Sequence, residues 1–494
     1  MATTLKLLRK TILQTIVGLV TLTWSLSGEA AAGYVSIDKD GEVWWFKAPD
    51  GKHFLSVGAN HVESLYWQSP NNQSFVRTQY GPDLILPNGQ INEGSEAAKK
   101  WAANVSRNFE TWGFNTFGFH NSLSASLRSA SKAFYVVELD LRTPWGWNMS
   151  RPQLLQAMKR RPTDIFSEDF RLAAEANADE FVKPRANDPL LLGYAYSDGP
   201  PWTVSDGTDA AALEKLSPAE KIIHPWVLTL MSQPANSSGK QAWLAGLKER
   251  YPSADKAGAT YGISASNWGD LAAPTAWRQI TDSAQAGADS QAFLGKIIRQ
   301  WYAVRQQAIR RHDTHHLILG DKLNINRDRK FPEELSRSLH LMNDYVDVIN
   351  IQYYAPFSEQ RETLAFIYKE CGKPILNGDT AVNPLWEDNP LSNTEFYGKL
   401  GKTYADHVTN LFSLPYFIGW HHCGYMRGLR KPYIEAMQRG DQPTVQFYLK
   451  SKHTFREGFI SELEEPITPL LTPLSQAIRE SEQVHAGTGV GKGL

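Results

Sequence analysis

Short apolar runs bounded by glycine, proline or aspartate recur along the chain, and segments with helical periodicity separate them. The runs are apolar on both faces, which is typical of parallel strands that lie beneath helices. Apolar residues repeat every three or four positions from Trp101 to Trp112 and stop at Gly113, a residue type that often follows a helix. A second repeat of this kind spans 293–308. The eight predicted strands are 54–60, 114–119, 134–140, 190–196, 316–321, 346–353, 374–379 and 416–420.

Eight strands that alternate with helices predict an α/β fold, the closed (β/α)8 TIM barrel. The chain has 494 residues, and a barrel with inserted loops absorbs that length around one core. Residues 203–288, after the fourth predicted strand, are too many for one crossover helix. We expect a helical insertion that forms a lid or rim, with a separately folded binding module as the alternative. The barrel domain is predicted over 33–480, and a disordered, glycine-rich tail over 481–494.

A hairpin is predicted ahead of the first barrel strand. The apolar segments 43–46 and 53–57 flank Pro49-Asp50-Gly51. Proline presets one backbone angle of a turn, and glycine tolerates the positive φ that a turn requires. This hairpin therefore delivers the chain into the barrel.

The N-terminus has the pattern of a secretory signal. Lys6, Arg9 and Lys10 precede an apolar stretch over 11–26, and small residues lead up to Ala32. We predict a signal peptide over 1–32 and a mature protein that is secreted or periplasmic and free of the membrane. A single membrane anchor is the alternative reading of the same stretch.

The charge balance excludes a class of partner. Lysine and arginine total 51 against 52 for aspartate and glutamate, without a long run of one sign, so we expect no nucleic-acid binding. The two cysteines, Cys371 and Cys423, stand before and after different predicted strands and should lie at opposite ends of the barrel, as free thiols. The 16 Trp, 19 Tyr and 21 Phe fit sugar-stacking surfaces or an aromatic core, and both readings stay open.

Barrel enzymes place their working residues at the C-terminal ends of the strands. Asp198 and Asp379 close the fourth and seventh predicted strands, and two converging carboxylates suggest chemistry on glycosidic bonds. Each polar residue at a strand end also has a structural alternative as a helix cap. Further candidates for substrate contacts are His61, His120, Asn121, Asp140, Trp202, Asp321, Tyr353, Trp420 and His421.

The sequence predicts no metal site and no cofactor. A metal-dependent hydrolase on this barrel would carry a His-x-His pair on its first strand, where only His61 is present. The adjacent His421 and His422 point to different faces if they are extended. The chain has no Gly-x-Ser-x-Gly elbow, phosphate loop or dinucleotide fingerprint.

Four segments of the chain resemble the clan A glycoside hydrolases, above all the family 50 β-agarases and the family 42 β-galactosidases. These segments occur in the same order as in that clan and are spread over about 35–470. They are Trp44 to His61, Asn187 to Tyr194, His316 to Asp321 and Lys373 to Asp379.

The resemblance implies a glutamate acid/base at the end of the fourth strand, after an asparagine, and a glutamate nucleophile at the end of the seventh. This chain departs at both places. Alignment on Trp202 puts Asp198 at the asparagine, Gly199 at the acid and Asp379 at the nucleophile. Asp379 is then the nucleophile or base and Asp198 the acid, while Asp140 or Glu138 are alternative sources of that proton.

The shorter aspartate side chains should widen the gap between the two carboxyl groups, which leads to the hypothesis of an inverting enzyme. We expect an exported hydrolase of β-glycosidic bonds in a polysaccharide or its oligosaccharides, of agar type. The alternative is an inactive glycan-binding barrel, because Gly199 marks a lost acid. Tyr353 is expected to orient the nucleophile, and Trp202, Trp420, Trp145 and Trp147 to stack on sugars. Sugar, linkage, exo or endo action and oligomeric state stay open.

Overall fold

The computed structural model describes residues 33–62, 70–87, 91–121, 125–141, 149–204, 210–273, 277, 279–382 and 388–489. The chain from Ala32 onward forms one compact unit. The predicted signal peptide, residues 1–32, lies outside the described residues. Within the described ranges, no helix is both long enough and apolar enough to cross a bilayer.

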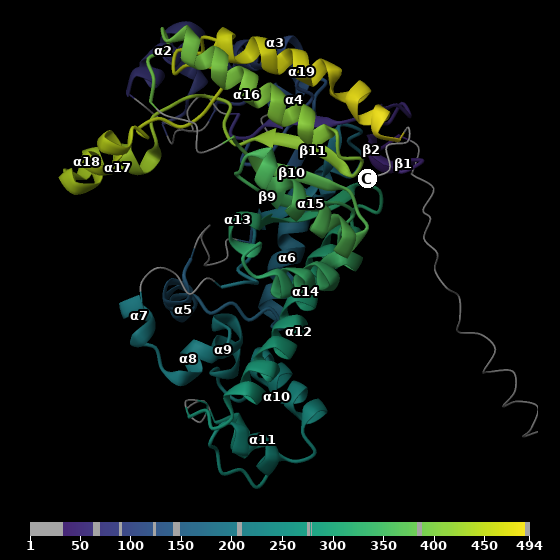
Figure 1. Ribbon diagram of the computed structural model, residues 1–494, viewed down its shortest axis with the longest axis vertical. Helices are drawn as coiled ribbons and strands as arrows, with labels where there is room; N and C mark the ends of the chain where they lie inside the picture. The colour runs from purple at the N-terminus through teal and green to yellow at the C-terminus, as the bar shows by residue number, and fades with distance from the viewer. Residues whose placement is uncertain are drawn as a thin grey trace, which may run out of the picture. The chain divides into compact units, whose positions relative to one another are not determined.

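Eight parallel strands close into a barrel, and each strand pairs with the next along the chain (Figure 1). The last strand, β11, pairs with the first, β4, and closes the ring. All eight predicted strands and the (β/α)8 fold are confirmed. The strands are β4 (Ser56–Ala59), β5 (Thr116–Phe117), β6 (Phe134–Glu138), β7 (Leu191–Asp198), β8 (Leu317–Asn324), β9 (Ile349–Gln352), β10 (Ile375–Thr380) and β11 (Phe417–His422).

The predicted helices form as their sequence signals indicate. In α3 (Glu96–Trp112) the Ser95 side chain accepts a hydrogen bond from the backbone of Ala98, and Gly113 ends the helix at φ 80°. The second predicted helix lies within α12 (Ser283–Arg310). The remaining helices outside the insertion are α2 (Pro70–Tyr80), α4 (Ala125–Ala130), α5 (Arg151–Arg160), α6 (Glu168–Phe181), α13 (Ile325–Asp328), α14 (Pro332–Met342), α15 (Phe357–Cys371), α16 (Thr394–Phe412), α17 (Lys431–Arg439), α18 (Gln442–Ser451) and α19 (Thr468–Ala486).

A small antiparallel sheet precedes the barrel. Strands β1 (Ser36–Asp40), β2 (Val43–Lys47) and β3 (His53–Phe54) pair in that order. The predicted hairpin is the β2–β3 pair, and it is confirmed. The first predicted strand is divided, because Phe54 pairs with β2 whereas Ser56–Ala59 belongs to the barrel.

The C-terminal segment is ordered where a disordered tail was predicted. Helix α19 continues to Ala486, and a 3-10 helix covers Gly487–Gly489. The two ring nitrogens of the buried His485 lie 2.8 Å from the carbonyl oxygen of Phe412 and 2.7 Å from that of Trp44. The expectation of disorder is therefore wrong for residues 481–489, because this side chain ties the helix to α16 and β2.

The insertion between β7 and α12 is helical, as predicted. Its helices pack on α5 and on α12, so the described part of the insertion covers the barrel's helices (Figure 1). Its buried side chains, Trp226 and Trp243 among them, belong to the same hydrophobic core as those of the barrel. The described part therefore does not behave as a separate module. Its helices are α7 (Ala210–Glu214), α8 (Pro218–Ile222), α9 (Pro225–Met231), α10 (Ser238–Arg250) and α11 (Ala254–Thr260).

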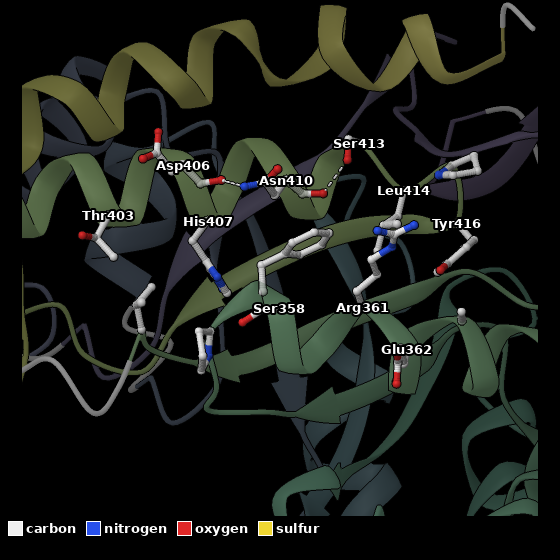
Figure 2. Close-up of a pocket in the computed structure, with 15 residues that line it drawn as sticks. Ser358, Arg361, Glu362, Thr403, Asp406, His407, Asn410, Ser413, Leu414 and Tyr416 are labelled. Carbon is white, nitrogen blue, oxygen red and sulfur yellow. Dashed lines mark hydrogen bonds between the residues drawn. The ribbon is translucent and has the colours of Figure 1, made fainter. Parts of the chain in front are cut away.

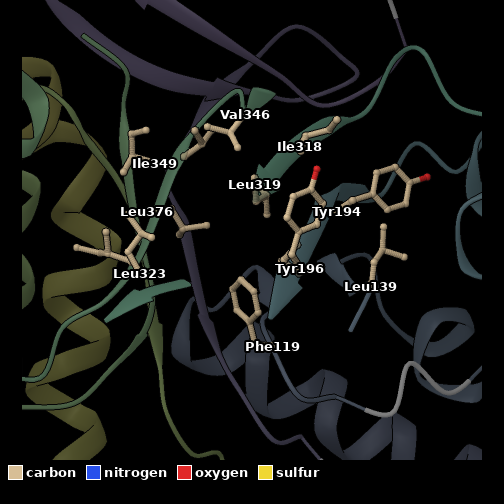
Figure 3. Close-up of a cluster of buried hydrophobic side chains, with 14 of the residues drawn as sticks. Phe119, Leu139, Tyr194, Tyr196, Ile318, Leu319, Leu323, Val346, Ile349 and Leu376 are labelled. Atoms are coloured by element: carbon tan, nitrogen blue, oxygen red, sulfur yellow. The ribbon is translucent and has the colours of Figure 1, made fainter. Parts of the chain in front are cut away.

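The core is built from apolar side chains that neighbouring strands contribute together. Figure 3 shows a part in which Tyr194 and Tyr196 of β7 lie near Leu319 of β8. Each large apolar side chain that is fully buried contributes about 1.5–3 kcal/mol. Cys371 at the end of α15 and Cys423 after β11 are both free thiols, as predicted.

Candidate active site

A buried lysine holds the two predicted carboxylates together at the C-terminal ends of the strands. Nζ of Lys322, in β8, lies 2.8 Å from Oδ1 of Asp198 and 3.3 Å from Oδ2 of Asp379. The same nitrogen lies 2.7 Å from Nε2 of His120, and the Lys322 side chain is fully buried. We call Lys322, Asp198, Asp379, His120 and Glu138 the strand-end cluster. Two carboxylates far apart in sequence thus converge, as the sequence predicted.

Strand β8 continues past its predicted end, and this places Lys322 inside the barrel. The prediction ended this strand at Asp321, but the strand runs to Asn324. Neighbouring residues of a strand point to opposite faces, so Asp321 and Lys322 differ in surroundings. Asp321 is fully buried and accepts a hydrogen bond of 2.9 Å from the indole of Trp301 in α12. The prediction that Asp321 contacts substrate is therefore wrong.

Asp379, in β10, is held in its ionised form. Its Oδ1 accepts a hydrogen bond of 3.1 Å from the side-chain amide of Asn60, and the phenol of Tyr354 donates another. Burial alone would raise the pKa of Asp379, but the positive charges of Lys322 and His120 outweigh it and lower this pKa. A buried, oriented carboxylate is what a glycosidase nucleophile requires.

Asp198, at the end of β7, is also ionised. Burial opposes its charge, but Lys322 and His120 hold the pKa of Asp198 well below its usual value. A general acid needs the reverse, a carboxyl group that keeps its proton near neutral pH. The ionised state of Asp198 therefore does not fit its predicted role as the acid. Its side chain is 42% exposed, so a ligand could still contact it.

His120 occupies the side of the cluster next to Glu138. The carboxylate of Glu138, at the end of β6, accepts from the His120 backbone at 2.8 Å and lies 3.1 Å from ring Nδ1. Nε2 lies 3.4 Å from Oδ1 of Asp198, and the ring stacks on that of His61 with centroids 4.7 Å apart. Burial and Lys322 lower the pKa of His120, but Glu138 and Asp198 outweigh them and raise it to about 9. Glu138 and Asp198 thus favour the protonated form of His120, and Lys322 opposes it.

His61 and His120 share an unusual backbone conformation. Their φ angles are 53° and 56°, in the left-handed region that non-glycine residues seldom adopt. Such conformations persist where the surrounding structure holds them, and they gather at functional sites. Burial, followed by Arg456, His120 and Lys322, holds the pKa of His61 well below its usual value, so this ring is neutral.

No side chain fits at Gly199, where the resemblance places the acid. A Cβ atom there would lie 2.4 Å from the carbonyl oxygen of Lys322 and 3.1 Å from the backbone nitrogen of Asn324. Both atoms belong to the backbone of β8 and cannot rotate away. The acid is therefore absent from this position for a structural reason, because β7 and β8 approach too closely there.

The expected widening between the carboxyl groups is wrong. Asp198, Asp379 and His120 each present one atom, and these three atoms lie within 4.8 Å of one another. Retaining glycosidases place their two catalytic groups about 5–5.5 Å apart, and inverting ones about 6.5–9.5 Å. Lys322 pairs with both aspartates and keeps their carboxyl groups close together.

The same three atoms have the spacing of a metal site, but an ammonium group takes the central position. Nζ of Lys322 contacts one atom of each residue: Oδ1 of Asp198 at 2.8 Å, Oδ2 of Asp379 at 3.3 Å and Nε2 of His120 at 2.7 Å. A divalent ion would need these ligands at about 2.0–2.2 Å and would displace the lysine. The chain supplies the positive charge of this site from its own side chain.

Comparisons with solved structures agree with the barrel. The chain is similar to an agarase, AgWH50C, with a TM-score of 0.65 and 15% identity over 93% of this chain and 66% of that one. It is similar to an exo-beta-agarase with a TM-score of 0.65 and 14% identity, over 92% of this chain and 66% of that one. It is also similar to PfGH50B, with a TM-score of 0.65 and 15% identity over 94% of this chain and 68% of that one.

The chain has the fold of these agarases. It spans about two thirds of the length of the structures that it matches. No protein-family model matches the chain, and no curated protein matches it in sequence. The likeness of this chain to these structures is one of fold.

Two of the remaining predicted polar residues, Asn121 and Asp140, follow strands β5 and β6. Asn121 accepts a hydrogen bond from the backbone of Val62 and donates one of 3.0 Å to the carbonyl oxygen of Gly118, so it braces the loops after β4 and β5. Asp140 is exposed and acts on Arg305 through its charge. Glu138, two residues earlier, occupies the place in the cluster.

The tyrosine that reaches the nucleophile is one residue later than predicted. The hydroxyl of Tyr353 is turned away and donates to the carbonyl oxygen of Glu359 at 3.1 Å. Tyr354 instead supplies the hydrogen bond to Asp379. The prediction for Tyr353 is wrong because β9 (Ile349–Gln352) ends just before this pair and its alternation sets which side chain faces inward.

The described aromatic candidates belong to the core. Trp202 is 2% exposed and stacks on Trp226 with ring centroids 5.5 Å apart. Trp420 is fully buried and meets Tyr404 of α16 edge to face at 6.2 Å. Their predicted roles as sugar platforms are wrong for this reason. The other two candidates, Trp145 and Trp147, lie outside the described residues.

His421 and His422 point to opposite faces, as predicted. Nε2 of His421 lies 2.8 Å from the hydroxyl of Ser56 inside the barrel, and burial lowers the pKa of His421 to about 3. Nε2 of His422 lies 3.0 Å from the hydroxyl of Tyr404 on the helical side. Because His421 is fully buried, its predicted contact with substrate is wrong.

The cluster residue that the sequence analysis missed is Lys322. Lys322 had a usable signal, because a charged side chain within an apolar strand needs a charged partner when it is buried. Asn60 and Tyr354 stand at strand ends, but only their contacts with Asp379 set them apart from the other polar residues there.

A large groove lies elsewhere on the barrel. This groove has a volume of about 1010 Å³. Residues of α15 and α16 line it, among them Arg361, Glu362, Asp406 and His407 (Figure 2). None of the cluster residues lines it. The candidate site is therefore identified by its converging charged side chains and not by the size of a cavity.

Proposed function

We propose that the protein is an exported glycoside hydrolase that cleaves β-glycosidic bonds in a polysaccharide or its oligosaccharides, with a galactan of agar type as substrate. One observation carries the proposal. An ionised carboxylate, Asp379, stands at the end of the seventh barrel strand, fixed by Asn60, Tyr354 and Lys322. Barrel hydrolases place their nucleophile at this end of the strands.

Asp379 acts as the nucleophile in this proposal. Its carboxylate attacks the anomeric carbon while the glycosidic bond breaks, and water then releases the sugar from the aspartate. The atoms of Asp198, Asp379 and His120 lie within 4.8 Å of one another, a spacing that supports retention of the anomeric configuration.

The substrate and the location rest on separate support. Two of the solved structures with this fold are an agarase and an exo-beta-agarase, which makes an agar-type galactan the substrate to examine first. Basic residues, an apolar stretch and small residues follow each other over 1–32, which supports cleavage of a signal peptide and export.

A panel of polysaccharides that includes agarose, carrageenan and β-1,4-galactan tests the proposal. The purified protein should release reducing ends from at least one polymer, and Asp379→Asn should lower that rate by at least about 10³-fold, because the lost group acts in the transition state. Asp406→Asn is the matched control, since Asp406 is 61% exposed on α16. Equal activity of the two variants would refute the role of Asp379.

The second candidate is a glycan-binding protein without hydrolysis. It is favoured by the closed backbone at Gly199, which leaves no room for the family's acid. In this case the migration of the protein through an agarose gel is slowed, or calorimetry shows that it binds agaro-oligosaccharides. The polysaccharide panel then yields no reducing ends.

A further inference from the structure

Hydrolysis at the strand-end cluster requires a proton donor that the cluster's carboxylates do not provide. The departing glycosidic oxygen must be protonated as its bond to the anomeric carbon breaks. Gly199 carries no side chain, and Asp198 is bound to Lys322 at 2.8 Å as a carboxylate. The proton must come from another side chain that borders the space beside Asp379.

We propose that His120, oriented by Glu138, is this acid and base, an inference that rests on the proposed hydrolase function. One nitrogen of His120 lies within 4.8 Å of an Asp379 carboxylate oxygen. This spacing is close to the separation of about 5–5.5 Å between the two catalytic groups of retaining enzymes. A quarter of the His120 side chain is exposed, so a ligand can reach it.

Glu138 fixes the orientation of the imidazole. The same carboxylate oxygen accepts a hydrogen bond of 2.8 Å from the His120 backbone and lies 3.1 Å from ring Nδ1. The ring of His61 supports one face of the imidazole at a centroid distance of 4.7 Å. With Nδ1 bound to Glu138, Nε2 is the nitrogen that gives and takes the proton.

Both protonation states of Nε2 have a partner. When Nε2 carries a proton, Oδ1 of Asp198, 3.4 Å away, accepts it, and the Lys322 ammonium must move back from its 2.7 Å contact because both nitrogens then donate. When Nε2 has lost that proton, the Lys322 ammonium donates to it at 2.7 Å. The pKa of His120, raised to about 9 by Glu138 and Asp198 against burial and Lys322, supports a protonated ring before cleavage. Lys322 then stabilises the neutral ring that cleavage leaves.

The two steps balance without an added reagent. In the first step an oxygen of Asp379 bonds to the anomeric carbon, the bond to the leaving sugar breaks, and the proton on Nε2 moves to the departing oxygen. In the second step neutral His120 takes a proton from water, the water oxygen bonds to the anomeric carbon, and Asp379 leaves as a carboxylate. His120 is then protonated again.

The charged and titratable groups that face His120 set the pH dependence. They are Glu138 of β6, Asp198 of β7, Lys322 of β8 and Asp379 of β10, together with the neutral His61 after β4. The protonated ring is the active form, so activity is present at neutral pH and falls as pH rises through the pKa of His120.

A comparison of leaving groups tests the role of His120 directly. The probes are agaro-oligosaccharides, whose leaving sugar needs a proton, and 2,4-dinitrophenyl β-D-galactoside, whose phenolate leaves without one. His120→Asn should lose about 10²–10⁴-fold in kcat on the oligosaccharides and less than about tenfold on the dinitrophenyl galactoside. His340→Asn is the control, with a side chain that is 60% exposed. Equal losses on the two probes would overturn the assignment.

The titration of His120 gives a second readout that does not depend on turnover. NMR signals of the His120 ring should show an imidazolium at pH 7 that loses its proton near the raised pKa of about 9. Glu138→Gln should lower that pKa, whereas Glu395→Gln, with a side chain that is 79% exposed, should not. A neutral His120 at pH 7 overturns this inference and leaves the hydrolase proposal standing. A protonated His120 in a protein that cleaves no sugar refutes both.

Discussion

Two largely buried histidines in different regions of the barrel titrate in opposite directions. His120 at the strand ends has its pKa raised to about 9, whereas burial lowers the pKa of His407, in the groove of Figure 2, to about 4. Burial disfavours the charged form of both rings. Glu138 and Asp198 flank the nitrogens of His120, while the described residues give neither nitrogen of His407 a hydrogen-bond partner. The comparison teaches that charge placement, rather than burial or cavity size, distinguishes the end of the barrel that carries the candidate site.

The largest effect is expected where the cluster loses its cation. In Lys322→Met the buried Asp379 carboxylate loses the larger of its two compensating charges, and the free energy of unfolding should fall by about 3–5 kcal/mol at pH 7. Removal of the lysine raises the folded-state pKa of Asp379 above its unfolded value, so the deficit should shrink as pH falls and the folded protein takes up a proton. Urea unfolding at pH 7 and pH 5 measures both quantities.

The control for Lys322→Met is Lys402→Met. Lys402 is 72% exposed and pairs with Asp406 at 2.9 Å along α16. Exposed pairs of this kind contribute about 0.3–0.5 kcal/mol, so the control should differ little from the wild type. A similar deficit in both variants would contradict the cluster's dependence on Lys322.

A smaller effect is expected from Tyr354→Phe. The variant loses a hydrogen bond to the charged Asp379, worth about 1.5–3 kcal/mol, which corresponds to a fall in kcat of about 10- to 100-fold. Because that bond lowers the pKa of Asp379, the acid limb of the pH–rate profile should move to higher pH. Tyr353→Phe loses only the bond to the backbone of Glu359, and its kcat should stay close to that of the wild type. Indistinguishable profiles for the two variants would break the assignment.

The smallest effect is expected in the groove. His407→Leu removes a buried imidazole without a hydrogen-bond partner, so the free energy of unfolding should rise by less than about 1 kcal/mol at pH 7. The lowered pKa means that the folded wild type resists protonation and loses stability as pH falls from 6.5 towards about 4. The advantage of the variant should therefore grow over this range in urea unfolding. A lower free energy of unfolding for His407→Leu at pH 7 would show instead that the His407 ring makes a stabilising hydrogen bond.

The fold was predictable in large part because its signals are local. The eight strands are short apolar runs, and α3 carries both its serine cap and its terminal glycine in the sequence. Boundaries were less predictable, since the end of a strand depends on its neighbours. Phe54 joined the small sheet, β8 ran on to Asn324, and α19 extended through a tail that composition alone marked as disordered.

The candidate site was predictable to the level of strand ends, and no further. The order of apolar runs was enough to bring Asp198 and Asp379 to one end of a barrel, because parallel strands align their carboxyl ends. One residue of strand register then separated Lys322 from Asp321 and Tyr354 from Tyr353, since neighbouring side chains face opposite sides.

By itself the sequence determined a closed parallel barrel and the two carboxylates at its C-terminal edge. The reason is that each strand segment is apolar on both faces, as a strand buried beneath helices must be. Only the tertiary structure decided that Lys322 joins those carboxylates, that Glu138 raises the proton affinity of His120, and that β8 leaves no space at Gly199. The physical reason is that pKa values and steric room depend on distances between strands, and no single segment of the chain contains those distances.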